Sequence, residues 1–294
     1  MSVVLRLTGH GKDLGGGFVV RRLLPAAQRQ AVGPFLFLDH FGPVTIEPGT
    51  SHDVRPHPHI GLATVTYLFE GAIMHRDSLG CSQRIEPGAI NWMTSGRGIV
   101  HSERAPEDLR GTRYVNHGLQ LWAALPLPSE EALPAFIHTP AADIPVAMVG
   151  KTDVRVLIGG AFGKTSPVKT YSKTIYLDVM LASGSRLDLP PLAEELAVYA
   201  VDGDVVVDGE RVAARTLATL TPGKMSVLEC SARTRLMVIG GDTLDAHRYL
   251  WWNFVSSRKE RIVQASDDWL AQVMGQVPGE SGFIPLPARR FSVS

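Results

Sequence analysis

Short runs of β-branched and aromatic residues, closed by turn residues about every eight to twelve positions, constrain the fold of this chain most. Two of these runs are "ATVTYLF" at 63–69 and "TIYLDVML" at 174–181. The pattern predicts an all-β fold, either a sandwich or a barrel. One late segment, 256–274, has a helical pattern with a Ser cap at its start and Gly275 at its end, so we predict one short C-terminal helix.

A weak internal repeat runs through the chain. "YLFEG" ends at Gly71 and "EPG" at Gly88, while "YAVDG" ends at Gly203 and "TPG" at Gly223. Each copy reads as a strand, a turn, a strand, a Pro-Gly turn and a further strand. The repeat therefore predicts two copies of a small β-barrel.

The Pro- and Ala-rich stretch 126–146 separates the two copies. We accordingly predict an N-terminal domain at 1–130 and a C-terminal domain at 131–294, the latter including the helix. The tail at 275–294 is rich in Pro and Gly and is expected to wrap over the surface.

Two pairs of polar residues interrupt the apolar pattern. His57 and His59 form an H-x-H pair, and His101 and Glu103 form an H-x-E pair. Side chains at positions i and i+2 of a strand point to the same face, so each pair aims two donors in one direction. Three imidazoles and a carboxylate suit Fe(II), Mn, Ni, Co, Cu or Zn better than Ca or Mg. We predict that these four residues bind one such metal with coordination positions left open, which implies reaction with a small molecule, often O₂.

The flanking residues agree with this prediction. Pro56 and Pro58 stiffen the approach of the first pair, and Gly96 and Gly98 allow a tight loop that delivers His101. We also expect the metal to be lost in mild acid, because imidazoles must be neutral to coordinate.

The repeat predicts that only the first copy carries chemistry. When the two copies are aligned at their shared turns, each of the four candidate metal ligands of the first copy falls opposite an apolar residue of the second. The pairs are His57 with Leu189, His59 with Pro191, His101 with Leu236, and Glu103 with Val238. No histidine occurs between His138 and His247.

The other histidines carry weaker signals. We expect His10 and His138 in loops, and His52, His75 and His247 at the surface or in caps. Four residues adjoin strands and are candidates for the surroundings of the site: Asp39, His40, His117 and Gln120.

Several classes of function lack support in the sequence. The 29 Lys and Arg balance the 29 Asp and Glu, and the basic clusters are short, so we expect no direct nucleic-acid or membrane binding. Neither a phosphate-binding glycine motif nor G-x-S-x-G is present. Cys81 and Cys230 have no metal-type spacing, and the start of the chain lacks the apolar region of a secretory signal. We therefore predict a cytoplasmic location.

The segment "HPHIGLATVTYLFEG" resembles the first cupin motif, and "PGAINWMTSGRGIVHSE" resembles the second. Ala63 or Thr64 replaces the glutamate of the general cupin motif, and the second histidine arrives late and brings Glu103 with it. Together with "FLFLDHFGP", "GLQLW" and "RYLWWNFVSS…FIPLP", this combination resembles the pirin family from about residue 5 to 290.

The resemblance implies an all-β bicupin, with two jelly-roll-like barrels of the double-stranded β-helix type and a metal in the first. The family's ligands fall on His57, His59, His101 and Glu103, with Fe(II) as the usual metal. Some members are quercetin 2,3-dioxygenases, in which Glu103 would also take the 3-hydroxyl proton of a flavonol before O₂ adds and CO leaves. Other members are regulators, so the alternative is a metal- or redox-dependent binding protein with a regulatory protein partner.

Overall fold

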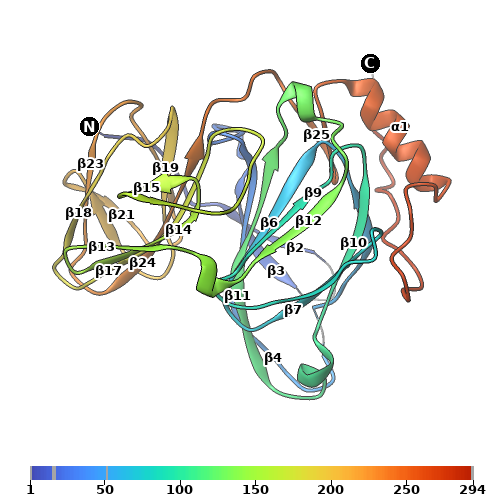
Figure 1. Ribbon diagram of the computed structural model, residues 1–294, viewed down its shortest axis with the longest axis horizontal. Coiled ribbons are helices and arrows are strands. Elements are labelled where there is room, and N and C mark those ends of the chain that lie inside the picture. The colour runs from blue at the N-terminus through green and yellow to red at the C-terminus, as the bar shows by residue number, and fades with distance from the viewer. Residues whose placement is uncertain (1, 15–17, 51, 293–294) are drawn as a thin grey trace. The chain divides into compact units, whose positions relative to one another are not determined.

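The computed structural model describes residues 2–14, 18–50 and 52–292, and strands are its main secondary structure (Figure 1). The chain divides into two compact units, one comprising 1–12, 21–39 and 139–244 and the other 13–20, 40–138 and 245–294. The C-terminal helix thus groups with the unit that contains both histidine pairs, whereas the division predicted at residue 130 assigned it to the C-terminal domain. No helix among the described residues is long and apolar enough to cross a membrane.

The first unit is built from two antiparallel sheets. The larger has the order β1 (Val3–Leu7), β22 (Leu217–Leu220), β19 (Glu195–Ala200), β24 (Thr234–Gly241), β17 (Thr174–Leu181), β14 (Thr152–Ile158) and β13 (Val146–Val149). The smaller has the order β18 (Arg186–Leu189), β23 (Ser226–Glu229), β20 (Val205–Val207) and β21 (Glu210–Val212). A short pair, β15 (Gly160–Ala161) with β16 (Lys164–Thr165), completes it.

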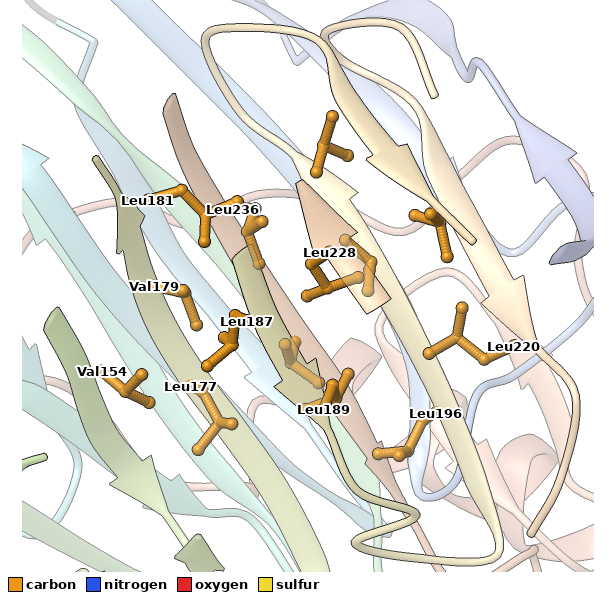
Figure 2. Close-up of a cluster of buried hydrophobic side chains, with 14 of the residues drawn as sticks. Val154, Leu177, Val179, Leu181, Leu187, Leu189, Leu196, Leu220, Leu228 and Leu236 are labelled. Atoms are coloured by element: carbon orange, nitrogen blue, oxygen red, sulfur yellow. The ribbon is translucent and has the colours of Figure 1, made fainter. Parts of the chain in front are cut away.

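Alternation along these strands builds the core of the first unit. Leu177, Val179 and Leu181 occupy every second position of β17, so their buried side chains point to the same face of the sheet. They join buried residues of the smaller sheet, including Leu187 and Leu228, in one apolar cluster (Figure 2). The interior of this barrel is filled with aliphatic side chains.

The second unit also has two sheets, a smaller one and a larger one. The smaller sheet has the order β5 (Val54–His59), β10 (Ile99–Arg104), β7 (Ile73–Asp77) and β8 (Ser82–Ile85). The larger sheet has the order β12 (Ala135–Thr139), β9 (Ile90–Thr94), β6 (Leu62–Glu70), β11 (Tyr114–Ala124), β4 (Phe35–Ile46), β3 (Val19–Leu24) and β2 (His10–Asp13), and β3 and β4 contain residues of both units. The 3-10 turns are η1 (Glu107–Leu109), η2 (Leu127–Ser129) and η3 (Ala141–Asp143).

The predicted repeat is present in the topology. The order β5-β10-β7-β8 has the same form as β18-β23-β20-β21, and β9-β6-β11-β4 has the same form as β22-β19-β24-β17. The sequence alignment of the two copies was nevertheless wrong after the second turn. The "EPG" turn that ends at Gly88 precedes β9, whereas the "TPG" turn that ends at Gly223 follows β22. The counterpart of β10 is therefore β23 and not β24.

The corrected alignment still places no histidine of the first unit at the positions that match His57 and His101. His101 lies opposite His57 in the β10–β5 pair. In the matching β23–β18 pair, Ser226 lies opposite Leu189, and both are buried. Leu189 therefore stays the counterpart of His57, while Ser226 replaces Leu236 as the counterpart of His101.

The C-terminal segment begins with a hairpin, β25 (Tyr249–Trp251) and β26 (Phe254–Ser256), and continues into α1 (Lys259–Leu270). The helix is shorter than the predicted 256–274 because β26 includes Ser256 and because Gln272 has a φ of 55°. Arg258 is the N-cap residue, and its backbone N–H donates to the hydroxyl of Ser256.

The described part of the tail contacts β5 and β10, as the prediction of a surface-wrapping tail requires. The Ile284 N–H donates to the Pro56 carbonyl at 2.8 Å. Ser102 donates its hydroxyl to Glu280 at 2.9 Å, and Arg104 forms an ion pair with the same carboxylate. Ser102 and Arg104 alternate with the predicted metal ligands on β10, so the tail braces the outer face of that strand.

Leu228→Ala should destabilise the protein by about 2–5 kcal/mol, because it opens a cavity in a fully enclosed aliphatic core. Metal affinity should not change, since Leu228 lies in the unit that lacks the histidine pairs. Urea unfolding measures the first effect and metal titration the second. Met225→Ala, at an exposed neighbouring position, is the control and should cost less than about 0.5 kcal/mol. A cost below about 1 kcal/mol for Leu228→Ala would contradict the packing described.

Candidate metal centre

Strand β10 brings the two predicted pairs together. It lies between β5 and β7, with His101 opposite His57 on one side and Asp77 on the other. Residues opposite each other in antiparallel strands place their side chains on the same face. The H-x-H pair of β5 and His101 of β10 therefore meet across one strand boundary.

The three histidines form a compact cluster. His57, His59 and His101 are 7%, 1% and 2% exposed, and each offers a ring nitrogen within 4.8 Å of those of the other two. Their ring centroids lie 4.3–5.1 Å apart. Trp122 on β11 packs edge-on against His59, with centroids 5.0 Å apart.

Hydrogen bonds select the tautomer of the first two histidines. The Nδ1 of His57 lies 2.9 Å from the Arg55 carbonyl, and the Nδ1 of His59 lies 3.1 Å from the Asn253 carbonyl. Carbonyl oxygens only accept, so both Nδ1 atoms must donate. A neutral imidazole then keeps its lone pair on Nε2, which is the arrangement of a metal-binding histidine with an outer hydrogen bond.

The third histidine gives a more direct sign that the cluster suits a metal ion. The Nε2 of His101 is enclosed and has no hydrogen-bond partner among the residues that the structure describes. Buried polar nitrogens are rarely left unpaired, because desolvation costs about 1–3 kcal/mol. The donor set and this unpaired nitrogen both fit a transition-metal ion.

The loop before β10 confirms the role predicted for its glycines. Gly96 has a φ of 48° and Gly98 a φ of 148°, both in the region that favours glycine. A Cβ at Gly96 would lie 1.9 Å from the Ala132 carbonyl oxygen. Only glycine fits this turn, which sets where β10 begins and hence where His101 lies.

Glu103 lies beside the histidine cluster but outside it. The pairing of β10 with β5 shifts register between His101 and Glu103, so Glu103 lies opposite Val54. Its carboxylate is not among the atoms that lie mutually within 4.8 Å. The side chain is half-buried, and desolvation raises the pKa of Glu103 to about 7.

Burial has the opposite effect on the histidines. Desolvation lowers the pKa of His57 to about 4 and that of His59 and His101 well below the usual value. The imidazoles are therefore neutral at pH 7 and ready to coordinate.

The four residues predicted to surround the site have polar partners of their own. His40 and His117 stack on each other with their Nε2 atoms 2.8 Å apart, Asp39 pairs with Arg22, and Gln120 accepts from Thr66.

His75 was predicted at the surface or in a cap, and that prediction is wrong. It is 3% exposed, and its Nδ1 lies 3.4 Å from the Nδ1 of His101. The signal was present in "MHRD", because His75 and Asp77 are a third polar pair at i and i+2.

Comparison with known proteins identifies the family. Residues 17–123 match the Pirin family model, and residues 176–275 match that of the Pirin C-terminal cupin domain. A pirin-like protein of Caulobacter vibrioides is 45% identical over 280 residues, which cover 94% of this chain and 96% of that protein. The chain belongs to the pirin family.

Solved structures of pirin-like fold agree. The crystal structure of a quercetin 2,3-dioxygenase from Acinetobacter baumannii matches with a TM-score of 0.90 and 34% identity, covering 100% of this chain and 96% of that one. The nickel(II) complex of the bacterial pirin YhhW from Escherichia coli shares the fold, with a TM-score of 0.65, 16% identity, and coverage of 82% and 99%. The predicted pirin family and all-β bicupin fold with one short C-terminal helix are confirmed.

The pKa values refine the predicted acid sensitivity of this pirin site. Glu103 must lose its proton to bind a metal, so affinity should begin to weaken below pH 7, by up to about tenfold per unit. His57 should add to the loss only near pH 4, and the lowered pKa values of His59 and His101 likewise delay their protonation beyond the ordinary histidine range. Chelator competition at pH 8, 6 and 5 measures this. A flat response down to pH 5 would exclude Glu103 from the ligands.

Proposed function

We propose that this pirin family member is a metal-dependent dioxygenase that cleaves a flavonol such as quercetin with O₂ and releases CO. The observation that carries the proposal is the cluster of three buried histidines, in which the enclosed Nε2 of His101 has no hydrogen-bond partner within residues 2–14, 18–50 and 52–292. The fold shared over the whole chain with a quercetin 2,3-dioxygenase at 34% identity supports the choice of substrate.

His57, His59 and His101 would hold the metal through their Nε2 atoms, with Glu103 as the fourth ligand. Iron(II) is our assignment, and Ni, Mn, Co, Cu or Zn would also suit this donor set. When bound, the ion would supply a Lewis acid and a template for the reacting molecules. The Arg55 and Asn253 carbonyls keep two of the imidazoles oriented for this task.

Glu103 would act as the base. A pKa of about 7 matches a group that must take a proton at neutral pH and release it again. The flavonol 3-hydroxyl would give its proton to this carboxylate. In the overall reaction both atoms of O₂ enter the products, and one ring carbon leaves in the CO. The proposal places this chemistry in the cytoplasm, with no direct part for nucleic acid or membrane.

The test is O₂ uptake with CO detection after anaerobic reconstitution with Fe(II) and addition of quercetin. We expect uptake and CO in equal amounts from the loaded protein, and neither from His101→Ala treated in the same way. Bound iron without uptake on quercetin or related flavonols would reject the dioxygenase. The alternative, a regulatory binding protein, would then require a protein partner that binds the loaded form and not His101→Ala.

A further inference from the structure

His75 and Asp77 on β7 form a buried pair directly behind His101. Asp77 is fully enclosed, and its Oδ2 lies 3.0 Å from the Nε2 of His75. The other ring nitrogen of His75, Nδ1, lies 3.4 Å from the Nδ1 of His101. Phe136 stacks on the His75 ring with centroids 4.1 Å apart and fixes its plane. Asp77, His75 and His101 therefore form a chain of contacts that ends at the histidine of the metal cluster.

The direction of the hydrogen bonds in this chain can be worked out from Asp77. Its Oδ1 accepts from the backbone N–H groups of Leu79 at 2.9 Å and Cys81 at 3.1 Å. A carboxylate in this position accepts only, so the Nε2 of His75 must donate to Oδ2. In a neutral His75 the Nδ1 then carries the lone pair. The Nδ1 of His101 must donate to it, which leaves the lone pair of His101 on Nε2.

We propose that Asp77 and His75 are positioning residues that set the tautomer of His101 and so make its Nε2 available to the metal. The inference rests on the metal site of the proposed function. It explains why His101 differs from its two neighbours, which donate their Nδ1 protons to backbone carbonyls. The ring of His75, oriented by a carboxylate, takes the place of that carbonyl.

The same residues admit another interpretation, because His75, Asp77 and Cys81 also place ligand atoms within 4.8 Å of one another. The contacts favour the tautomer role, since both oxygens of Asp77 are already used by His75 and by two backbone N–H groups. The two interpretations differ in the number of metal ions bound per chain and in the effect of Cys81→Ala.

Asp77→Asn is the sharpest test. The Asn oxygen would keep the two backbone N–H groups, which forces the amide NH₂ toward His75. That reverses the polarity of the chain: His75 must accept at Nε2 and donate at Nδ1, and His101 then carries its proton on Nε2. We expect the affinity for Ni(II), a probe that does not oxidise in air, to fall about 10–100-fold by chelator competition. Unfolding of the metal-free variant shows whether the fold is kept.

Two substitutions at His75 complete the test and allow for a variant that fails to fold. His75→Asn places an amide oxygen where Nδ1 stood, so it should hold wild-type affinity within about threefold. His75→Leu has no acceptor and should lose affinity as Asp77→Asn does, by about 10–100-fold. Equal affinities for Asp77→Asn, His75→Leu and wild type would overturn the proposal.

Metal stoichiometry separates the remaining outcomes. The proposal requires one Ni(II) per wild-type chain and no change in Cys81→Ala. Two ions per chain, with one lost in Cys81→Ala, would replace the tautomer role with a second metal site. Wild-type protein that binds no divalent metal would reject the proposed function itself, and this inference with it.

Discussion

His101→Ala should leave the protein folded and unable to retain a divalent metal at micromolar concentration. Its Nε2 is enclosed and has no partner in the described part of the chain, and its ring centroid lies 4.3 Å from that of His57 and 5.1 Å from that of His59. Four-ligand zinc sites in small peptides bind with about 10–16 kcal/mol, so one ligand accounts for roughly 3 kcal/mol, or at least about 100-fold in affinity. Metal content after dialysis and chelator competition both report the loss.

His10→Ala is the matched control, because it removes an exposed histidine by the same substitution. It should bind metal as the wild type does. Metal-free His101→Ala should unfold cooperatively, which separates loss of a ligand from loss of the fold. Wild-type stoichiometry and affinity in His101→Ala would show that the histidine cluster does not bind the metal.

Glu103→Gln should lower flavonol turnover by about 10²–10⁴-fold, the usual contribution of a positioned general base. It should also change stability in a way that depends on pH. The folded pKa of Glu103, about 7, lies above the ordinary 4.5. The contribution of Glu103 to the free energy of unfolding is therefore fully present below about pH 4.5, where the carboxyl is protonated in both states. It is lost as pH rises through 7, because the folded protein must then hold a buried carboxylate. With its partial exposure, the difference is on the order of 2 kcal/mol.

Thermal unfolding of the metal-free proteins at pH 5 and pH 8 measures this second effect. Glu103→Gln should gain stability relative to wild type as pH rises, because the amide carries no buried charge. Glu107→Gln, an exposed glutamate four residues along the chain, should show no such difference. A variant with full turnover, or one with the same pH dependence as wild type, would contradict the role of Glu103 in catalysis or its burial, respectively.

The strands and the three clustered histidines were predictable because their signals are local. Alternation with a period of two marks strands such as β17, and the same period places His57 with His59 on one face. The two barrel turns and the glycine loop were enough to predict that β10 brings His101 to the same place. Pairing partners are not local, and there the prediction reached its limit.

Two errors show this limit. Pro-Gly turns occur in many hairpins, so "TPG" at Gly223 was matched to "EPG" at Gly88 although the two close different strand pairs. His75 was judged by its neighbours in sequence, and its burial depends on β7 pairing with β10. In the same way, no local pattern links His59 to the carbonyl of Asn253, which lies 194 residues further on.

That long-range bond has a consequence for how the protein matures. The carbonyl that orients His59 and the Glu280 carboxylate that braces β10 both belong to residues made long after β5 and β10, 194 residues after His59 and 178 after Ser102. Domains generally fold in the order of their synthesis, yet this barrel lacks those two supports until Asn253 and Glu280 have emerged from the ribosome. We therefore expect the site to acquire its metal only after Glu280 has emerged, and not when β5 and β10 have just been made. The ions free in the cell at that moment would then compete for the site.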